Sequence, residues 1–358
     1  MDVFGVIMAG GGGTRFWPLS RQLKPKQMLN LTGGDMMINE TIDRMSLTVR
    51  RENIRIVTNA KQSDAMRKVV TERVLPENIL VEPVARNTAA CIGYAAIDIL
   101  KRHGDGVMLI TPSDHYISDA HALSETFQTA IKAAEEEDKL VTIGLKPLFA
   151  STGYGYIRYN DDVQGDAKPV LEFREKPDEQ TARSYVESGE YAWNSGMFIW
   201  KVSTILDCFR MKLPDIYEGL SQIGDAIGSP NEREVINTVY PQLRKISIDY
   251  GVMEACAAQG QVLLVPGFFE WNDVGSWDMM RSLNRTDENG NVLVGDVLAI
   301  DAKNCICYST KRTVAIAAVS NIVVVETADA ILVCSSDKAQ NVKQIVDVLG
   351  QQGRDELL

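Results

Sequence analysis

The first 145 residues alternate short apolar runs with longer stretches of helical spacing. The apolar runs predict buried strands at residues 3–8, 54–57, 107–110 and 140–143. The stretches between them predict helices at residues 61–73, 87–102 and 119–138. This alternation is typical of an α/β fold with a doubly wound, mostly parallel sheet covered by helices on both faces. In such a fold, ligands bind beyond the carboxyl ends of the strands.

Polar residues at the start of two of these helices suggest where they begin. Asn87-Thr88 and Ser118-Asp119 each offer an N-cap, because a short side-chain oxygen can accept a hydrogen bond from the free N–H groups of a first turn. Further helices are expected near residues 178–188, 203–227 and 275–284. Since no linker interrupts the pattern, we expect residues 1–285 to form one large domain.

The pattern changes after residue 285. Short β-rich runs recur every eight or nine residues, near Val297, Ile306, Val314, Val323 and Ile331. This spacing predicts a small all-β appendage over residues 286–358, built either as a stacked solenoid or from hairpins. A helix is expected to follow at residues 338–349.

Composition and charge narrow the class of protein. Hydrophobic residues make up 45% and charged residues 24% of the 358 positions, which is typical of a globular chain. The net charge of −11 argues against nucleic acid or an anionic membrane as a partner. No apolar run reaches the ~18 residues of a membrane span, and the first residues do not resemble a signal peptide. The six cysteines lack metal or disulfide spacing, so we expect reduced thiols and a cytoplasmic location.

The most informative motif is a glycine run directly after the first strand. It consists of Gly10, Gly11, Gly12, Gly13 and Thr14, followed by Arg15. Glycine lets main-chain N–H groups surround an anion, and the Arg15 guanidinium offers several donors to phosphate oxygens. The run is neither a Walker A loop nor a dinucleotide fingerprint. Lys26 follows on a segment stiffened by Pro25, and we expect both cations to be loosely packed phosphate-binding groups.

Two carboxylates that are far apart in the sequence stand out, one after a predicted strand and the other between aromatic residues. Asp114 comes just after the strand at residues 107–110, and Asp273 lies between Trp271 and Trp277. Two carboxylates make a poor metal site alone, but together with phosphate oxygens they suit Mg²⁺. The alternative is that each merely caps a turn or helix.

Several ordered motifs identify the chain as a member of a known family. The opening run at residues 9–27 resembles the signature of the sugar-nucleotide pyrophosphorylases, and most closely that of the bacterial mannose-1-phosphate guanylyltransferases. Matching motifs follow in order at residues 82–88, 112–115, 153–157, 173–177, 194–198, 247–250 and 271–277. This resemblance implies the Rossmann-like fold of nucleotide-diphospho-sugar transferases with a β-helix-like appendage, and a homodimer.

The resemblance also implies an activity and a role for each motif. The reaction would convert GTP and mannose 1-phosphate into GDP-mannose, a polysaccharide precursor, and pyrophosphate. The catalytic residues would be Arg15, Lys26 and Lys176, and Asp114 and Asp273 would bind Mg²⁺. The nucleotide would be bound by the glycine run with Glu82, Asn87 and Thr88. The sugar would be bound by Gly155, Glu175, Asn194 and Asp249.

The residue chemistry is compatible with this reaction. A phosphate oxygen is already ionised near neutral pH, so the nucleophile needs no general base, and no catalytic triad is evident among the three histidines. The reaction instead needs positioning and charge stabilisation. Two alternatives remain: a nucleotidyltransferase of the same fold with another base or hexose phosphate, or a non-catalytic relative that binds nucleotide sugars. Retention of the complete cation and carboxylate set argues against the second.

Overall fold

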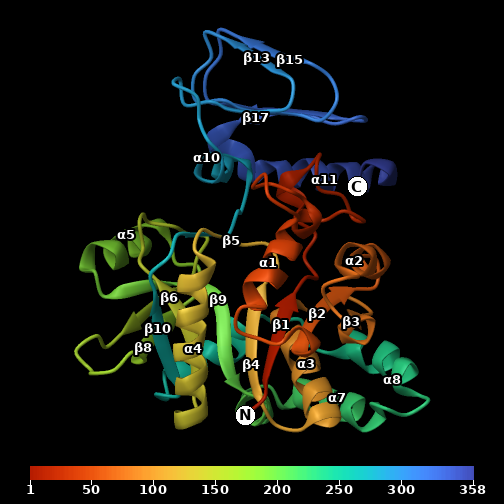
Figure 1. The fold of residues 1–358 in the computed structure, drawn as a ribbon, viewed down its shortest axis with the longest axis vertical. Coiled ribbons are helices and arrows are strands. Elements are labelled where there is room, and N and C mark those ends of the chain that lie inside the picture. The colour runs from red at the N-terminus through yellow and green to blue at the C-terminus, as the bar shows by residue number, and fades with distance from the viewer.

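A nine-stranded mixed sheet forms the centre of the larger part of the molecule in a computed structural model, which describes all 358 residues (Figure 1). Across the sheet the strands are β3 (Ile79–Glu82), β2 (Ile54–Asn59), β1 (Val3–Met8), β4 (Val107–Pro112), β9 (Tyr191–Lys201), β6 (Leu140–Leu145), β10 (Val262–Gly267), β8 (Lys168–Arg174) and β7 (Tyr156–Tyr159). Strands β1 to β4 are parallel, as are β6 and β10. Strand β9 runs antiparallel between β4 and β6, so the sheet is mixed where the pattern alone predicts mostly parallel strands.

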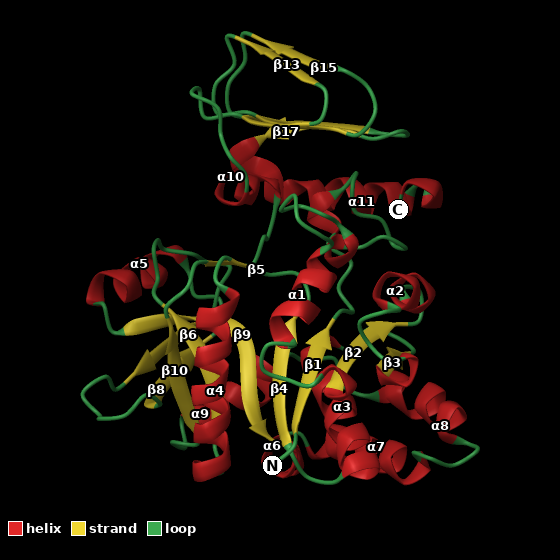
Figure 2. Cartoon of the chain, in the orientation of Figure 1, coloured by secondary structure: helices red, strands yellow, loops and turns green.

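Helices cover both faces of this sheet because its central strands carry apolar side chains on both sides. Along β1, Phe4 and Val6 point into one core and Ile7 into the other, as the two-residue period of a strand requires. One face packs against α1 (Met37–Met45), α2 (Ser63–Val70) and α4 (Ala120–Glu137). The other packs against α3 (Asn87–His103), α6 (Val202–Lys212), α7 (Pro214–Ala226), α8 (Glu232–Val239) and α9 (Glu254–Ala257). Figure 2 shows α4 lying along the sheet. The predicted doubly wound architecture is confirmed.

Helix boundaries follow local chemistry in some places and tertiary contacts in others. Asp119 caps α4 as predicted, because its carboxylate accepts hydrogen bonds from the N–H groups of His121 and Ala122. The N-cap predicted at Asn87-Thr88 is wrong: Asn87 has a φ of 66°, and the Thr88 hydroxyl instead accepts from the N–H of Ile248 at 2.8 Å. The predicted helix at 203–227 is two helices, α6 and α7, since Pro214 cannot continue α6 and starts α7.

The appendage is a stacked solenoid and not a set of hairpins. Strands β12 (Val292–Val294), β14 (Ile306–Ser309) and β16 (Ile322–Glu326) stack in parallel, and β13 (Val297–Ile300) stacks in parallel on β15 (Val314–Ala317). Strand β17 (Ile331–Ser335) ends the stack by pairing antiparallel with β16. A 3₁₀ turn at Ser336–Asn341 then leads into α11 (Val342–Gln351).

A shared apolar core joins the solenoid to the sheet domain. Phe16, Trp17 and Trp277 from the larger part pack with Val323 and Val342 from the smaller. Helix α11 accordingly lies between the solenoid strands and the rest of the molecule (Figure 1). The expected division at residue 285 stays a prediction, and this shared core packs the two parts against each other.

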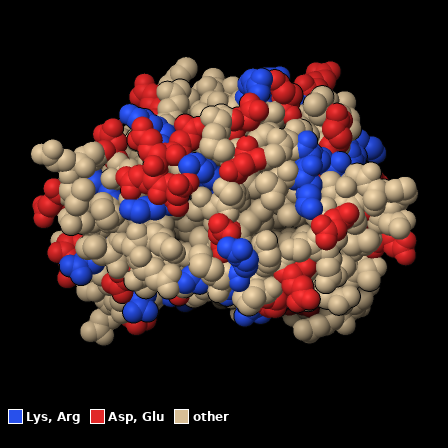
Figure 3. All heavy atoms as spheres, turned by 90° about the horizontal axis from the view of Figure 1, so that it is seen from below, with Lys and Arg blue, Asp and Glu red and all other residues tan.

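The end of the molecule away from the solenoid carries acidic and basic side chains interspersed with one another (Figure 3). No helix combines the length and the hydropathy that crossing a membrane requires.

Two short helices complete the fold, α5 (Glu179–Ser188) and α10 (Met280–Leu283).

Candidate active site

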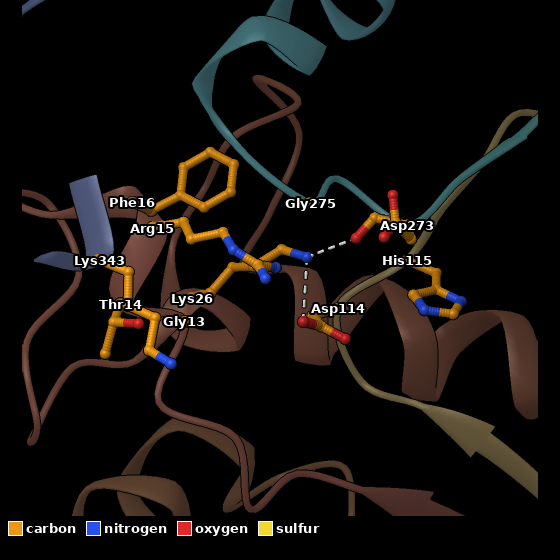
Figure 4. A pocket seen from close by; sticks show the side chains of 10 residues that line it. All are labelled: Gly13, Thr14, Arg15, Phe16, Lys26, Asp114, His115, Asp273, Gly275 and Lys343. Carbon is orange, nitrogen blue, oxygen red and sulfur yellow. Dashed lines mark hydrogen bonds and ion pairs between the residues drawn. The ribbon is translucent and has the colours of Figure 1, made fainter. Parts of the chain in front are cut away.

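A pair of two-residue strands brings Asp114 and Asp273 into one pocket. Asp114 follows β4 at the carboxyl edge of the sheet, and β5 (Tyr116–Ile117) comes two residues later. Strand β5 pairs antiparallel with β11 (Trp271–Asn272), and Asp273 directly follows β11. Both side chains therefore line a pocket of about 370 Å³ together with Arg15 and Lys26 (Figure 4).

Lys26 connects the two aspartates. Its Nζ atom lies 3.0 Å from Asp114 Oδ2 and donates to the main-chain oxygen of Asp273 at 2.6 Å, as the dashed lines in Figure 4 mark. Burial alone would raise the pKa of Asp114, but the Lys26 charge, the neighbouring His115 and the hydrogen bonds to this carboxyl together lower it. The Lys26 side chain is only 5% exposed, so the expectation that it is loosely packed is wrong. It is fixed because glycine at position 13 allows close approach of the loop to it.

The glycine run is shaped by side-chain amides that hold its carbonyl groups. Gln27 Nε2 donates to the carbonyls of Ala9 and Gly11, and Asn59 Nδ2 donates to that of Gly10 at 3.1 Å. The N–H groups of Gly10 to Gly13 donate to no atom of the chain. Gly13 has a φ of 59°, and a side chain there would overlap Lys26 Cβ. The loop thus presents free N–H groups beside exposed Arg15, an arrangement suited to an anion.

A second pocket of about 380 Å³ adjoins the glycine run. It is lined by Gly10, Gly11, Glu82, Asn87, Thr88 and Asp114, among others. Glu82 is buried, and burial raises the pKa of its carboxyl to about 7, although the Tyr240 hydroxyl that donates to it acts in the opposite direction. A buried carboxylate with one partner still has acceptor capacity for a ligand with paired N–H donors.

A third pocket, of about 210 Å³, gathers the predicted sugar-binding residues. Its lining includes Gly155, Glu175, Lys176, Asn194 and Asp249. Asn194 Nδ2 donates to Asp249 Oδ1 at 2.9 Å, and Lys176 pairs with Glu175. Burial, and next the charge of Glu175, raise the pKa of Asp249 to about 6. A side chain at Gly155 would overlap Glu175 Oε2 and crowd Asn194 Cβ, so glycine at this position lets both side chains lie close to the turn.

The three pockets adjoin one another because they share lining residues. Asp114 lines the first and second pockets, whereas Asp273 and His115 line the first and third. His115 Nδ1 accepts a hydrogen bond from Trp271 Nε1 at 3.1 Å, and burial lowers the pKa of its ring to about 4. The His115 ring is therefore uncharged near neutral pH, and its hydrogen bond with Trp271 holds it between the first and third pockets. Asp114 and Asp273 each lie where the first pocket adjoins one of the other two.

Comparison with known proteins supports one family over the whole chain. The nucleotidyl transferase family matches residues 4–290, and a mannose-phosphate isomerase/GMP-like β-helix domain matches residues 295–349. The chain belongs to the nucleotidyl transferase family. The resemblance inferred from the motifs is confirmed.

Individual proteins that are similar to this chain support the family assignment. A mannose-1-phosphate guanylyltransferase of Salmonella muenchen is 39% identical, with 98% of this chain and 74% of that protein covered. The alginate biosynthesis protein AlgA of Pseudomonas aeruginosa is 36% identical over 98% of this chain and 73% of its own length. A Thermus thermophilus crystal structure, described as a mannose-1-phosphate geranyltransferase, is 33% identical with a TM-score of 0.88, covering 98% of this chain and 100% of that one.

Members of this family commonly use a divalent metal ion, and the site has suitable ligands for one. Carboxylate oxygens of Asp114 and Asp273 line the same pocket, and they are the hard donors that such ions prefer. No group of three or more His, Cys, Asp or Glu side chains that could hold a metal ion lies together anywhere in the chain. The further ligands would therefore have to be phosphate oxygens or water.

Sequence reasoning missed several residues that build these pockets. Tyr154, whose hydroxyl donates to Asp273 Oδ1 at 2.9 Å, lies inside one of the family motifs, as does Gln27. Tyr240 and Lys343 lie outside every motif. No spacing in the sequence relates them to the glycine run, because only the folded chain brings them there.

Proposed function

We propose that this chain catalyses the formation of GDP-mannose and pyrophosphate from GTP and mannose 1-phosphate. The observation that carries the proposal is that three neighbouring pockets adjoin at Asp114 and Asp273. A nucleobase, a triphosphate and a sugar phosphate each need one pocket, and the two reacting phosphates must meet where the pockets join. The names of the relatives supply the identity of the base and of the sugar.

The reaction is an in-line displacement at phosphorus. An oxygen of mannose 1-phosphate forms a bond to the α-phosphorus of GTP, and the bond from that phosphorus to the bridging oxygen of pyrophosphate breaks. The electron pair leaves with pyrophosphate, and no proton has to be removed from the ionised nucleophile. The chain must therefore hold two polyanions together and stabilise negative charge on the leaving group.

The residues divide this task by position. Glu82, Asn87 and Thr88 would contact the nucleoside, and the N–H groups of the glycine run with Arg15 and Lys26 would hold the triphosphate. Glu175, Asn194, Asp249 and the backbone of Gly155 would bind the sugar hydroxyls, with Lys176 on its phosphate. Mg²⁺, held by Asp114 and Asp273, would neutralise charge on the phosphate oxygens.

Substrate specificity tests this proposal directly. Pyrophosphate release is measured with four nucleoside triphosphates against several hexose 1-phosphates. GTP with mannose 1-phosphate should give the highest kcat/KM, since unpaired buried groups reduce it by a factor of about 10⁴ with a wrong base. Equal turnover of ATP, or of dTTP with glucose 1-phosphate, would favour another nucleotidyltransferase of this fold. Binding of GDP-mannose without turnover of any pair would indicate a non-catalytic relative.

We also propose a cytoplasmic location and a homodimer. Five of the six free thiols are buried, which fits a reducing compartment. The solenoid exposes Leu298, Ile300 and Ile331, which a second copy could cover. Cell fractionation and light scattering of the purified chain test these two statements.

A further inference from the structure

One cation of the phosphate pocket comes from the appendage. Lys343, the second residue of α11, lines this pocket together with Thr14 and Arg15. Its side chain is exposed and makes no hydrogen bond or ion pair within the chain. The only other lysine of the pocket, Lys26, is buried and already bound to Asp114. Lys343 is therefore available to a ligand.

The position of Lys343 is fixed by the packing on either side of it. The preceding residue, Val342, is 1% exposed in the core shared by the two parts of the molecule. Gln340 Nε2 donates to Ser276 Oγ at 2.9 Å, which ties the segment to the loop that carries Asp273. Trp17 Nε1 donates to the main-chain oxygen of Leu357 at 2.9 Å, which ties the end of the chain to the segment after the glycine run. Hydrogen bonds to the Asp273 loop and to the segment after the glycine run thus hold the chain just before and just after α11.

The location within the pocket indicates which phosphates Lys343 meets. Asp114 and Asp273 mark the side on which the base and sugar pockets open, so the α-phosphate lies there. Lys343 lines neither of those pockets, and Figure 4 shows it with Thr14 on the side away from Asp273 and His115. The end of the triphosphate that is farthest from the base must point toward this side.

We infer that Lys343 binds the pyrophosphate end of the nucleoside triphosphate, so that the appendage supplies a phosphate-binding residue for the reaction. The inference rests on the proposed function, because it assigns part of the same pocket. Lys343 and Arg15 then share the charge of the leaving group while Lys26 stays with the aspartates. A lysine ammonium on an exposed stem suits this task, since it can follow the leaving pyrophosphate.

The reverse reaction tests the inference, because pyrophosphate is then a substrate in its own right. GDP-mannose contains the α-phosphate and the sugar phosphate but not the pyrophosphate group. In Lys343→Ala, the KM for pyrophosphate should rise about tenfold while the KM for GDP-mannose is unchanged, as expected when one charged contact is lost. Lys343→Arg keeps the charge and should stay within about threefold of the wild type. The matched control is Lys338→Ala, an exposed lysine of the preceding turn that does not line the pocket.

The outcomes separate this inference from the proposed function. If Lys343→Ala turns over as fast as the wild type and its KM for pyrophosphate is unchanged, the inference is overturned and the proposed function is not. Equal increases in both KM values, or an effect of the same size in Lys338→Ala, would also overturn it, because they indicate a general change of the fold or the surface charge. Absence of GDP-mannose pyrophosphorolysis in the wild type would overturn the proposed function and the inference with it.

Discussion

The pocket that we propose binds phosphate has two sides, and they differ in how their charged side chains are paired. On one side Lys26 is buried and bound to Asp114 and to the backbone of Asp273, whose carboxylate also accepts from Tyr154. On the other side Arg15 and Lys343 are exposed and have no partner in the chain. The first side is already bonded without a ligand, whereas the second has uncompensated positive charge.

This difference matches the needs of a displacement at phosphorus. The atoms that react must be held in a fixed geometry, and a buried network of charged groups provides that. The leaving group only needs charge neutralisation and must depart afterwards, which exposed cations on flexible stems allow. The following predictions test this division, starting with the largest effect.

Loss of either aspartate should have the largest effect. Asp114→Asn and Asp273→Asn should each lower kcat by about 10³-fold, and the double variant should lose far less than the product, because residues acting as a unit are not additive. A Mg²⁺ titration of turnover measures both effects. Asp278→Asn is the control, because Asp278 lies in the 3₁₀ turn that follows the Asp273 loop and does not line this pocket. Multiplicative losses with an unchanged Mg²⁺ midpoint would show that the aspartates do not share a metal ion.

Loss of Arg15 should come second. Arg15→Ala should lower kcat by about 10²-fold, and Arg15→Lys should recover it only in part, because lysine lacks the planar set of donors. The thermal unfolding midpoint should not change, since this side chain is exposed and unpaired. Lys24→Ala is the control, as Lys24 is an exposed cation of the same motif outside the pocket. A lower unfolding midpoint with normal kcat of the folded fraction would assign Arg15 a structural role.

Gly13 lies against Lys26, so a substitution at Gly13 tests how closely the glycine run packs on this lysine. Gly13→Ala combines a left-handed backbone with an overlap on Lys26, and should destabilise the fold by about 2 kcal/mol. Gly11→Ala is the control, because no atom lies within 4 Å of a side chain at that position. Thermal unfolding of both variants measures the difference. Equal stability of the two would mean that the loop moves away from Lys26 freely.

The base pocket should give the smallest of these effects, a dependence on pH. The Glu82 carboxyl, with a pKa of about 7, accepts ligand N–H donors fully only when ionised, so its contribution decreases as the pH falls through that value. The KM for GTP should therefore rise as the pH is lowered from about 8 to about 6. Glu82→Gln should remove this trend and raise the KM about tenfold at the upper end of that range. A trend that persists unchanged in Glu82→Gln would assign the titration to the nucleotide.

Much of the fold was predictable because its signals are local. The apolar runs at β1, β2, β4 and β6 and the carboxylate at the start of α4 were identified correctly, since strand burial and an N-cap depend on neighbouring residues. The antiparallel insertion of β9 was not evident, because the direction of a buried strand leaves no trace in its apolar pattern. The same limit applies to Thr88, which meets Ile248 instead of capping its own helix.

The sequence by itself determined the family and several of the alternating strands and helices, and it marked residues whose chemistry suits phosphate, sugar and metal. These conclusions rest on short motifs, whose chemistry depends on residues that are close together in the sequence. Only the tertiary structure decided that β5 and β11 bring Asp114 to Asp273, that Lys26 is buried between them, and that the solenoid returns Lys343 to the glycine run. These contacts join residues far apart in the chain, and they form because apolar side chains from distant segments share one core.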